Sequence, residues 1–333
     1  TLKGKLVLLA TMQLGGVGIM TFAIFLSYFM RNALTVRNLS ALKEMMNTEN
    51  LVTARKLLVN VFMATLIFEI IGAMDLFFSW NASVYFKSIV ERIFHSVFHS
   101  VSAFCNAGFS TFPDGLNSPD VRISYLSHLV IILLIFFGSL GFPVINDLFN
   151  VTRLRNRMQY PWKRWELNTR ISIYTSIVLV LTGAILFFFL EADLSGNGLS
   201  QRIITSLFQS ATTRTAGFNT VSIDALSSST IILFIFLMFI GASPASTGYR
   251  IKPTTFVVLF RAAYATVRGV DEVEIGVRNI ARETLLRAYT VFLFAATYIL
   301  LTVFLLSITE SEASLVSIVF EAVSAFCTVG LST

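Results

Sequence analysis

Long apolar runs recur along the chain, and they restrict it to a membrane fold. A helix needs about 20 residues to cross the hydrocarbon core of a bilayer. Six runs reach that length: Leu6–Phe29, Leu51–Phe78, Tyr125–Phe149, Ile171–Leu190, Ile231–Ala263 and Ala288–Leu306. Only 13% of the residues are charged, against about a quarter in a soluble domain. The sequence therefore predicts an all-α, multi-spanning membrane protein.

Basic side chains collect in three of the connections between these runs. These connections follow the first, third and fifth runs, and among their basic residues are Arg31, Arg37, Arg153, Arg155, Arg157, Arg268 and Arg282. The positive-inside rule places such connections in the cytoplasm. This asymmetry explains most of the net charge of +6, so nucleic acid is not expected as a partner. Gln13 and the glycines beside it argue against a cleavable signal peptide in the first run.

The connections on the opposite side repeat one pattern around a glycine. They read FHSVSAFCNAGFST at 98–111, FQSATTRTAGFNT at 208–220 and FEAVSAFCTVGLST at 320–333. Gly108, Gly217 and Gly330 are about 110 residues apart, which indicates one repeated supersecondary unit. The segments before them, Ile89–Phe104, Leu199–Thr213 and Leu315–Phe326, are too short to span a bilayer. They are predicted to be re-entrant pore helices.

The extended pieces after these short helices are candidate walls of an ion filter. A dehydrated alkali cation needs a cage of oxygen dipoles, which main-chain carbonyls supply. Glycine permits the backbone angles that turn those carbonyls inward. Asp and Glu are absent from these positions, which favours a filter for a monovalent ion. The predicted filter residues are Cys105, Asn106, Ala107, Gly108, Thr215, Ala216, Gly217, Thr328, Val329 and Gly330.

Several motifs resemble those of the Ktr/Trk/HKT superfamily of potassium transporters. They are TRTAGFN at 213–219, SAFCNAGF at 102–109, SAFCTVGL at 324–331 and QLGGVGIMTF at 13–22. The likeness covers essentially the whole chain and is closest to bacterial pore subunits of the KtrB type. It implies tandem helix–pore-loop–helix repeats around a single pore, with four repeats expected. It also implies potassium translocation across the cell membrane, in bacteria the inner membrane, with K⁺ held by the filter carbonyls.

The resemblance also divides the chain into repeats. Residues 1–30 correspond to the inner helix of repeat 1, 51–150 to repeat 2, 165–268 to repeat 3, and 279–333 to repeat 4 without its inner helix. The first and last repeats are therefore expected to be incomplete, leaving three of four filter walls in this chain.

A run of small and polar residues interrupts the fifth apolar run. The resemblance implies an intramembrane gating loop beneath the filter, and proline with small residues supplies a movable backbone there. The predicted gating residues are Ala242, Ser243, Pro244, Ala245, Ser246, Thr247, Gly248, Tyr249, Arg250 and Lys252. Tyr249 and Arg250 stand where the family pattern has glycines. We expect them to stiffen the loop, and the cation of Arg250 to repel potassium near the pore axis.

Partners and cofactors follow from the resemblance alone. It implies a homodimer in the lipid bilayer, seated on a cytosolic KtrA-like ring that binds ATP or ADP. No cofactor is expected in this chain itself, where K⁺ is the transported ion. A sodium- or proton-coupled potassium symporter is the alternative, since broken helices are typical of transporters too. An enzyme is not expected, because the sequence has no Asp pair, no His–Glu zinc motif and no candidate serine nucleophile.

Other conspicuous residues have simpler interpretations. Gly15, Gly16 and Gly18 are interpreted as helix-packing positions. Cys105 and Cys327 are interpreted as inert thiols, and His95 and His99 as packing or hydrogen-bonding side chains. Arg214 cannot project into a cation path, so we expect it behind the filter, paired with a carbonyl or an acid. Glu321 is a candidate for that acid.

Overall fold

The structure is a computed structural model that describes residues 1–17, 51–80, 84, 86–160, 165–191, 198–241, 251–270, 272–275 and 278–333. The described residues form two compact units. The first contains Thr1–Thr169 and Ala216–Thr220, and the second contains Arg170–Thr215, Val221–Ser243 and Gly248–Thr333. Each unit is described by itself below.

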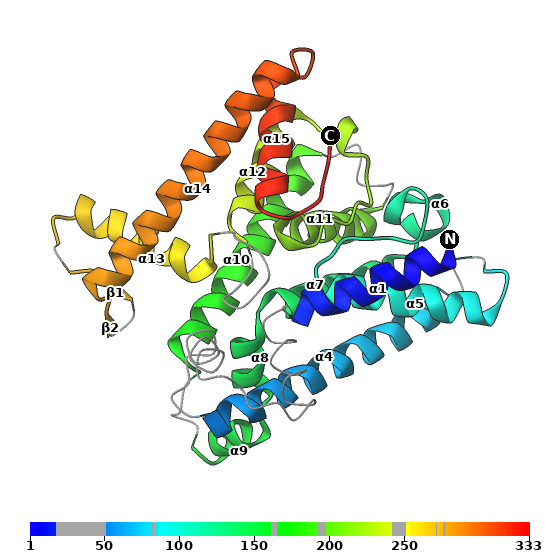
Figure 1. Ribbon diagram of the computed structural model, residues 1–333, viewed down its shortest axis with the longest axis horizontal. Helices are drawn as coiled ribbons and strands as arrows, with labels where there is room; N and C mark the ends of the chain where they lie inside the picture. Colours follow the sequence, from blue (N-terminus) through cyan, green and yellow to red (C-terminus); the bar gives the residue numbers. More distant parts are fainter. Residues whose placement is uncertain are drawn as a thin grey trace. The chain divides into compact units, whose positions relative to one another are not determined.

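The first unit is built on a long apolar helix, α4, which lies against α5 and α7 (Figure 1). Its elements are α1 (Leu2–Val17), α4 (Leu51–Ser79), α5 (Ile89–Phe104), η1 (Gly115–Asn117), α6 (Pro119–Arg122), α7 (Tyr125–Ser139), α8 (Phe142–Phe149) and α9 (Val151–Gln159). Ser88 caps α5 by accepting the N–H of Glu91 at 3.1 Å. The Glu91 carboxylate in turn accepts the N–H of Lys87. These two hydrogen bonds fix where the short helix begins.

The run Tyr125–Phe149, predicted as one continuous span, is broken. The axes of α7 and α8 differ in direction by 108°. Gly141 adopts φ +76°, in the left-handed region that favours glycine, and Pro143 stands in the first turn of α8, where its missing N–H costs nothing. Gly141 and Pro143 therefore end one helix and start another, and the bent pair is either one broken span or a re-entrant loop.

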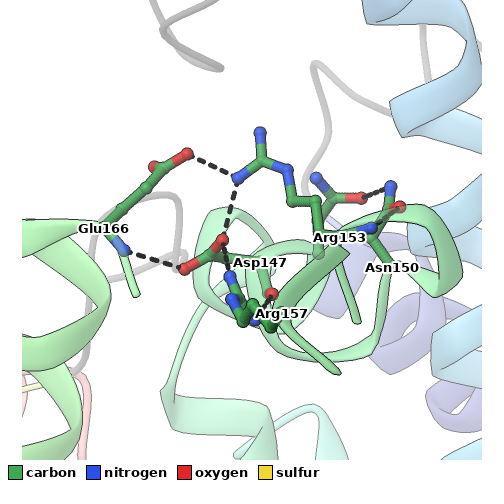
Figure 2. A network of polar contacts seen from close by, with 6 residues as sticks. Asp147, Asn150, Arg153, Arg157 and Glu166 are labelled. Atoms are coloured by element: carbon green, nitrogen blue, oxygen red, sulfur yellow. Dashed lines mark hydrogen bonds and ion pairs between the residues drawn. The ribbon is translucent and has the colours of Figure 1, made fainter. Parts of the chain in front are cut away.

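A polar network holds the connection that follows α8 (Figure 2). Asp147, with a side chain 1% exposed, accepts hydrogen bonds from Arg153, from Arg157 and from the backbone N–H of Glu166. Asn150 caps α9, because its side-chain oxygen accepts the N–H of Arg153 at 3.2 Å. One buried carboxylate thus fixes the end of α8, the whole of α9 and the residue before α10.

The second unit surrounds a cluster of buried phenylalanines that includes Phe187, Phe234 and Phe320. Its elements are α10 (Leu167–Leu190), α11 (Leu199–Thr215), η2 (Ile223–Ala225), α12 (Ser228–Phe239), α13 (Pro253–Val267), β1 (Glu274–Ile275), β2 (Arg278–Asn279), α14 (Arg282–Thr309) and α15 (Leu315–Phe326). The short helix α15 packs against both α12 and α14 (Figure 1). The antiparallel hairpin β1–β2, with Ile275 opposite Arg278, was not predicted.

The interruption of the fifth run divides it into α12 and α13. Ile240 and Ile251 form an isolated β-bridge at the base of the interruption, and the N–H of Gly241 donates to the carbonyl of Ile251 at 3.2 Å. The predicted gating residues Ala242, Ser243, Pro244, Ala245, Ser246, Thr247, Gly248, Tyr249 and Arg250 lie outside the described residues, whereas Lys252 is exposed at the N-cap of α13.

Within the described part of the chain, three helical stretches are long and apolar enough to cross a membrane. They are Asn60–Ser79, Leu167–Leu190 and Arg282–Thr309, and the bent pair α7–α8 would make a fourth span. Large apolar side chains on them, such as Phe189, Leu300 and Phe304, are exposed. Exposed apolar surface of this extent suits contact with lipid.

Candidate functional site

The loop after α5 is a tight turn that ends in a left-handed glycine. Asn106 has φ +53° and Gly108 has φ +72°. The N–H of Ala107 donates to the carbonyl of Ser102 at 2.8 Å, and the Ser102 hydroxyl donates to the carbonyl of Phe109 at 2.8 Å. The last turn of the pore helix therefore fixes the path of the backbone on both sides of Gly108.

The loop after α15 has the same conformation at the equivalent positions. Thr328 has φ +51° and Gly330 has φ +86°. The N–H of Val329 donates to the carbonyl of Ser324 at 2.9 Å, and the Ser324 hydroxyl donates to the carbonyl of Leu331 at 2.6 Å. The sequence repeat is therefore also a structural repeat, with the same two hydrogen bonds and the same two positive φ angles in both loops.

The loop after α11 is a shorter variant of this turn. The helix continues to Thr215, two residues beyond the predicted end, and Gly217 follows with φ +79°. The phenylalanine that opens the motif precedes the glycine by nine residues here and by ten in the other two loops. No left-handed non-glycine residue occurs in this loop, because positive φ outside glycine is confined to Asn106 and Thr328 in the described chain.

Two of these loops touch within the first unit. A Cβ atom added to Gly108 would lie 2.1 Å from the carbonyl oxygen of Ala216. A Cβ atom on Gly115 would likewise lie 2.2 Å from the side-chain oxygen of Asn219. Only glycine allows the backbones to approach this closely. The predicted filter residues Gly108, Ala216 and Gly217 are thus brought together, and the polar group at the closest approach is the main-chain carbonyl of Ala216.

In two of the loops, a side chain of the pore helix forms a hydrogen bond with the serine two residues after the glycine. The Nε2 atom of His99 lies 2.9 Å from the hydroxyl of Ser110. At the equivalent place after α15, the Glu321 carboxylate accepts the hydroxyl of Ser332 at 2.7 Å and the N–H of Thr333 at 2.8 Å. Imidazole in one repeat and carboxylate in another therefore hold the same hydroxyl position.

Arg214 is buried at the end of α11, with 2% of its surface exposed. Its guanidinium donates to the carbonyl and hydroxyl of Ser176 at 3.3 Å and to the carbonyl of Gly241 at 3.4 Å. These partners agree with the expected carbonyl pairing. The suggested acidic partner, Glu321, instead holds Ser332 and Thr333.

The histidines and small residues near α5 have structural roles. The Nδ1 atom of His95 lies 2.7 Å from the hydroxyl of Thr111, and Nδ1 of His99 lies 2.8 Å from the carbonyl of His95. Within the described ranges, no three His, Cys, Asp or Glu side chains lie close enough together to share a metal ion. A Cβ atom on Gly16 would lie 2.2 Å from the Cys105 sulfur, whereas Gly15 has open space. The packing interpretation therefore applies to Gly16.

Besides Asp147, two more buried carboxylates, Glu69 and Glu191, had no predicted role. Glu69 interrupts an otherwise apolar stretch of α4, and Gln13 donates to it at 3.0 Å. Glu191, just beyond α10, accepts the backbone N–H of Ser227 at 2.7 Å. Burial acts to raise the pKa of Glu191, but hydrogen bonds from Ser227 and Thr230 outweigh it and hold the pKa below its ordinary value. A charged residue inside an apolar run was the available signal for Glu69.

Comparison with known proteins gives matches along the whole chain. A profile of the TrkH family, described as cation transport protein, matches residues 2–333. The Ktr system potassium uptake protein B of Vibrio alginolyticus is 33% identical, over 100% of this chain and 71% of that protein. The protein of the same name from Bacillus subtilis is 32% identical, over 100% and 72%. The potassium/sodium uptake protein NtpJ of Enterococcus hirae is 29% identical, over 99% and 71%.

A solved structure shares the fold. The crystal structure of the potassium transporter TrkH from Vibrio parahaemolyticus matches with a TM-score of 0.69 at 17% identity, over 97% of this chain and 64% of that one. The chain thus spans slightly less than two thirds of that transporter. The match confirms the predicted all-α membrane fold with pore-loop repeats.

Proposed function

Because the chain belongs to the TrkH family of cation transport proteins, we propose that it forms the pathway by which potassium ions cross the membrane in a potassium uptake system. Family membership confirms the resemblance that the motifs indicated. The chain is an integral protein of the plasma membrane, and the bacterial relatives favour the inner membrane. Two relatives that cover it fully are named as potassium uptake proteins.

The observation that carries the proposal is the repeated glycine turn after each short pore helix. Gly108, Gly217 and Gly330 all have positive φ, and serine hydroxyls fix the carbonyl after Gly108 and after Gly330. A carbonyl-lined strand of this kind replaces the hydration shell of a monovalent cation without full negative charge. In the proposal, residues 105–108, 215–217 and 328–330 supply the K⁺-binding carbonyls.

The proposal extends to the other parts of the transport system. Residues 242–250 and Lys252 form a gating loop below the filter, and its base is closed by the bridge between Ile240 and Ile251. The repeats follow the boundaries 1–30, 51–150, 165–268 and 279–333. The protein works as a homodimer with a cytosolic nucleotide-binding ring, and it catalyses no chemical reaction.

Sodium-coupled uptake is a second candidate, favoured by one observation. A relative that is 29% identical over 99% of this chain is named as a potassium/sodium uptake protein. Coupling would make potassium flux depend on a sodium gradient, whereas a channel-like path would not.

Rubidium flux into liposomes that hold the purified full-length protein tests the proposal. The parent protein is expected to show flux that potassium inhibits, and Gly217→Asp is expected to show none. A carboxylate in the filter would bind the ion too tightly, and its side chain would occupy space in the ion path. Flux that persists in Gly217→Asp, or that potassium does not inhibit, would contradict the filter assignment. Repeating the measurement with and without a sodium gradient separates the two candidates.

A further inference from the structure

Glu69 places a carboxylate inside a membrane-spanning helix. It lies within the apolar stretch Asn60–Ser79 of α4, and 6% of its surface is exposed. An ionisable side chain at this depth is costly, and in membrane proteins it usually has a functional partner inside the protein. The proposed carbonyl filter needs no such charge in its wall, so the partners of Glu69 indicate what it does.

Three helices meet at this residue. The side-chain amide of Gln13 on α1 donates to Oε2 of Glu69 at 3.0 Å. The thiol of Cys105, at the end of α5, lies 3.8 Å from Oε1. The hydroxyl of Ser100 on α5 donates to the main-chain carbonyl of Glu69 at 2.7 Å. Glu69 therefore contacts the first residue of the proposed second filter strand.

The thiol of Cys105 is confined on its other side. A Cβ atom on Gly16 would lie 2.2 Å from the sulfur, so the backbone of α1 lies directly behind it. The neighbouring Phe68 ring stacks on Phe104, with ring centroids 5.5 Å apart. Phe68 and Glu69 thus contact Phe104 and Cys105, the two residues directly before Asn106.

This turn needs external support. Asn106, the residue after Cys105, adopts φ +53°, a left-handed conformation that is uncommon outside glycine. Strained backbone of this kind persists where its surroundings determine it. A shift of Cys105 would rotate the peptide groups of Asn106 and Ala107, whose carbonyls belong to the proposed filter.

The fourth repeat has the same turn, with a different residue environment around its cysteine. Thr328 there has φ +51°. Cys327, the counterpart of Cys105, is fully buried in an apolar cluster with Phe320 and Val329. Cys327 thus packs in an apolar cluster, whereas Cys105 contacts a carboxylate. Because an ionisable side chain inside a membrane-spanning helix is costly, its place beside the proposed second filter strand points to a role in the filter.

We infer that Glu69 is a positioning residue that sets the carbonyl geometry of the second filter strand through Cys105 and Gln13, and so determines how well the pore discriminates potassium from sodium. The inference rests on the proposed function. A carbonyl site selects between these cations through the number and arrangement of its dipoles, so a displaced strand alters selectivity more than it alters maximal flux.

The test compares Glu69→Ala and Glu69→Gln with the parent protein in rubidium-flux liposomes, with potassium and sodium as competitors. Asp75→Asn is the matched control, because Asp75 is an exposed carboxylate on the same helix. In Glu69→Ala, the ratio of the sodium to the potassium inhibition constant is expected to fall at least tenfold, with maximal flux within about threefold. In Glu69→Gln, which keeps one acceptor oxygen, a fall of about threefold is expected. Asp75→Asn should match the parent.

Three results would decide against the inference. One is an unchanged inhibition ratio in both Glu69 variants, and another is a loss of maximal flux with the ratio preserved, which indicates a structural role alone. An equal shift in Asp75→Asn would assign the effect to charge on α4. If Glu69→Ala does not fold, Glu69→Gln decides. Absence of potassium-inhibited flux in the parent protein would overturn the proposed function instead, so the two failures are distinguishable.

Discussion

Replacement of Gly108 is expected to have a direct effect on the rate of ion transport. Its φ of +72° strains any other residue, and an added Cβ atom would meet the Ala216 carbonyl at 2.1 Å. Gly108→Ala is therefore expected to reduce potassium-inhibited rubidium flux more than tenfold, because the two proposed filter strands must separate. Flux into liposomes, normalised to the amount of folded protein, measures the effect.

Two other glycines serve as controls for this substitution. Gly269 also has positive φ, +67°, but open space around its Cβ position, and Gly15 has open space within α1. Gly269→Ala should cost about 1 kcal/mol of stability, and Gly15→Ala should cost none. Both should retain flux. A similar loss of flux in Gly269→Ala and Gly108→Ala would show that backbone strain anywhere, rather than contact between filter strands, explains the result.

Glu191 predicts a pH-dependent contribution to stability. Its pKa in the folded protein lies below the ordinary value of 4.5, so the carboxylate stabilises the fold above that pH, and the stabilisation is lost as the pH falls through the folded pKa. Glu191→Gln should lower stability by about 1 kcal/mol at pH 7, and the difference should shrink below pH 4.5. Thermal unfolding in detergent at both pH values measures it. Glu312→Gln, at an exposed position, should show no difference at either pH.

Residues that act within one motif were predictable, whereas residues that act across the fold were not. The three filter glycines were predicted from a pattern contained within 14 residues. Glu69 contacts Gln13, 56 positions away, and Glu191 contacts Ser227, 36 positions away. No local pattern specifies such partners. The untested assignment of the filter itself stays a prediction.

At the level of elements, the network around Asp147 shows how one side chain fixes a connection between two repeats (Figure 2). Asp147→Ala would leave Arg153 and Arg157 without their shared carboxylate, at a cost of about 3 kcal/mol. The thermal unfolding midpoint in detergent should fall by several degrees. Arg155→Ala, an exposed position on the same helix α9, should leave it unchanged. Equal effects of the two substitutions would mean that net charge, and not this network, stabilises the connection.

Element boundaries were predictable where a chemical signal marks them. The predicted pore helices Ile89–Phe104 and Leu315–Phe326 have the same bounds as α5 and α15, because Ser88 and Ser314 cap their first turns and cysteine follows each. The break at Gly141 and Pro143 was missed, since hydropathy alone does not distinguish a straight span from a bent one. Gly141 and Pro143, standing close together inside the apolar run, were the available sequence signal for the bend.

At the level of the whole molecule, composition and charge asymmetry predicted the class of fold before any motif was considered. The apolar exposed faces of α4, α10 and α14 follow from a solvent that offers no hydrogen bonds. Partners and assembly leave no comparable signature in the described contacts. Binding of partners and assembly depend on surfaces that are matched by surfaces of other chains.

The glycine loop after α11 is one residue shorter than the other two and has no left-handed residue before Gly217. In the proposed pore, the filter walls are therefore not copies of one another, and they are joined in a single chain. In a homomeric channel, one codon change alters every wall of the pore, because all subunits are identical. Here a substitution alters one wall only. Selection can thus adjust ion preference in small steps, one wall at a time, without passing through a pore in which every wall is altered.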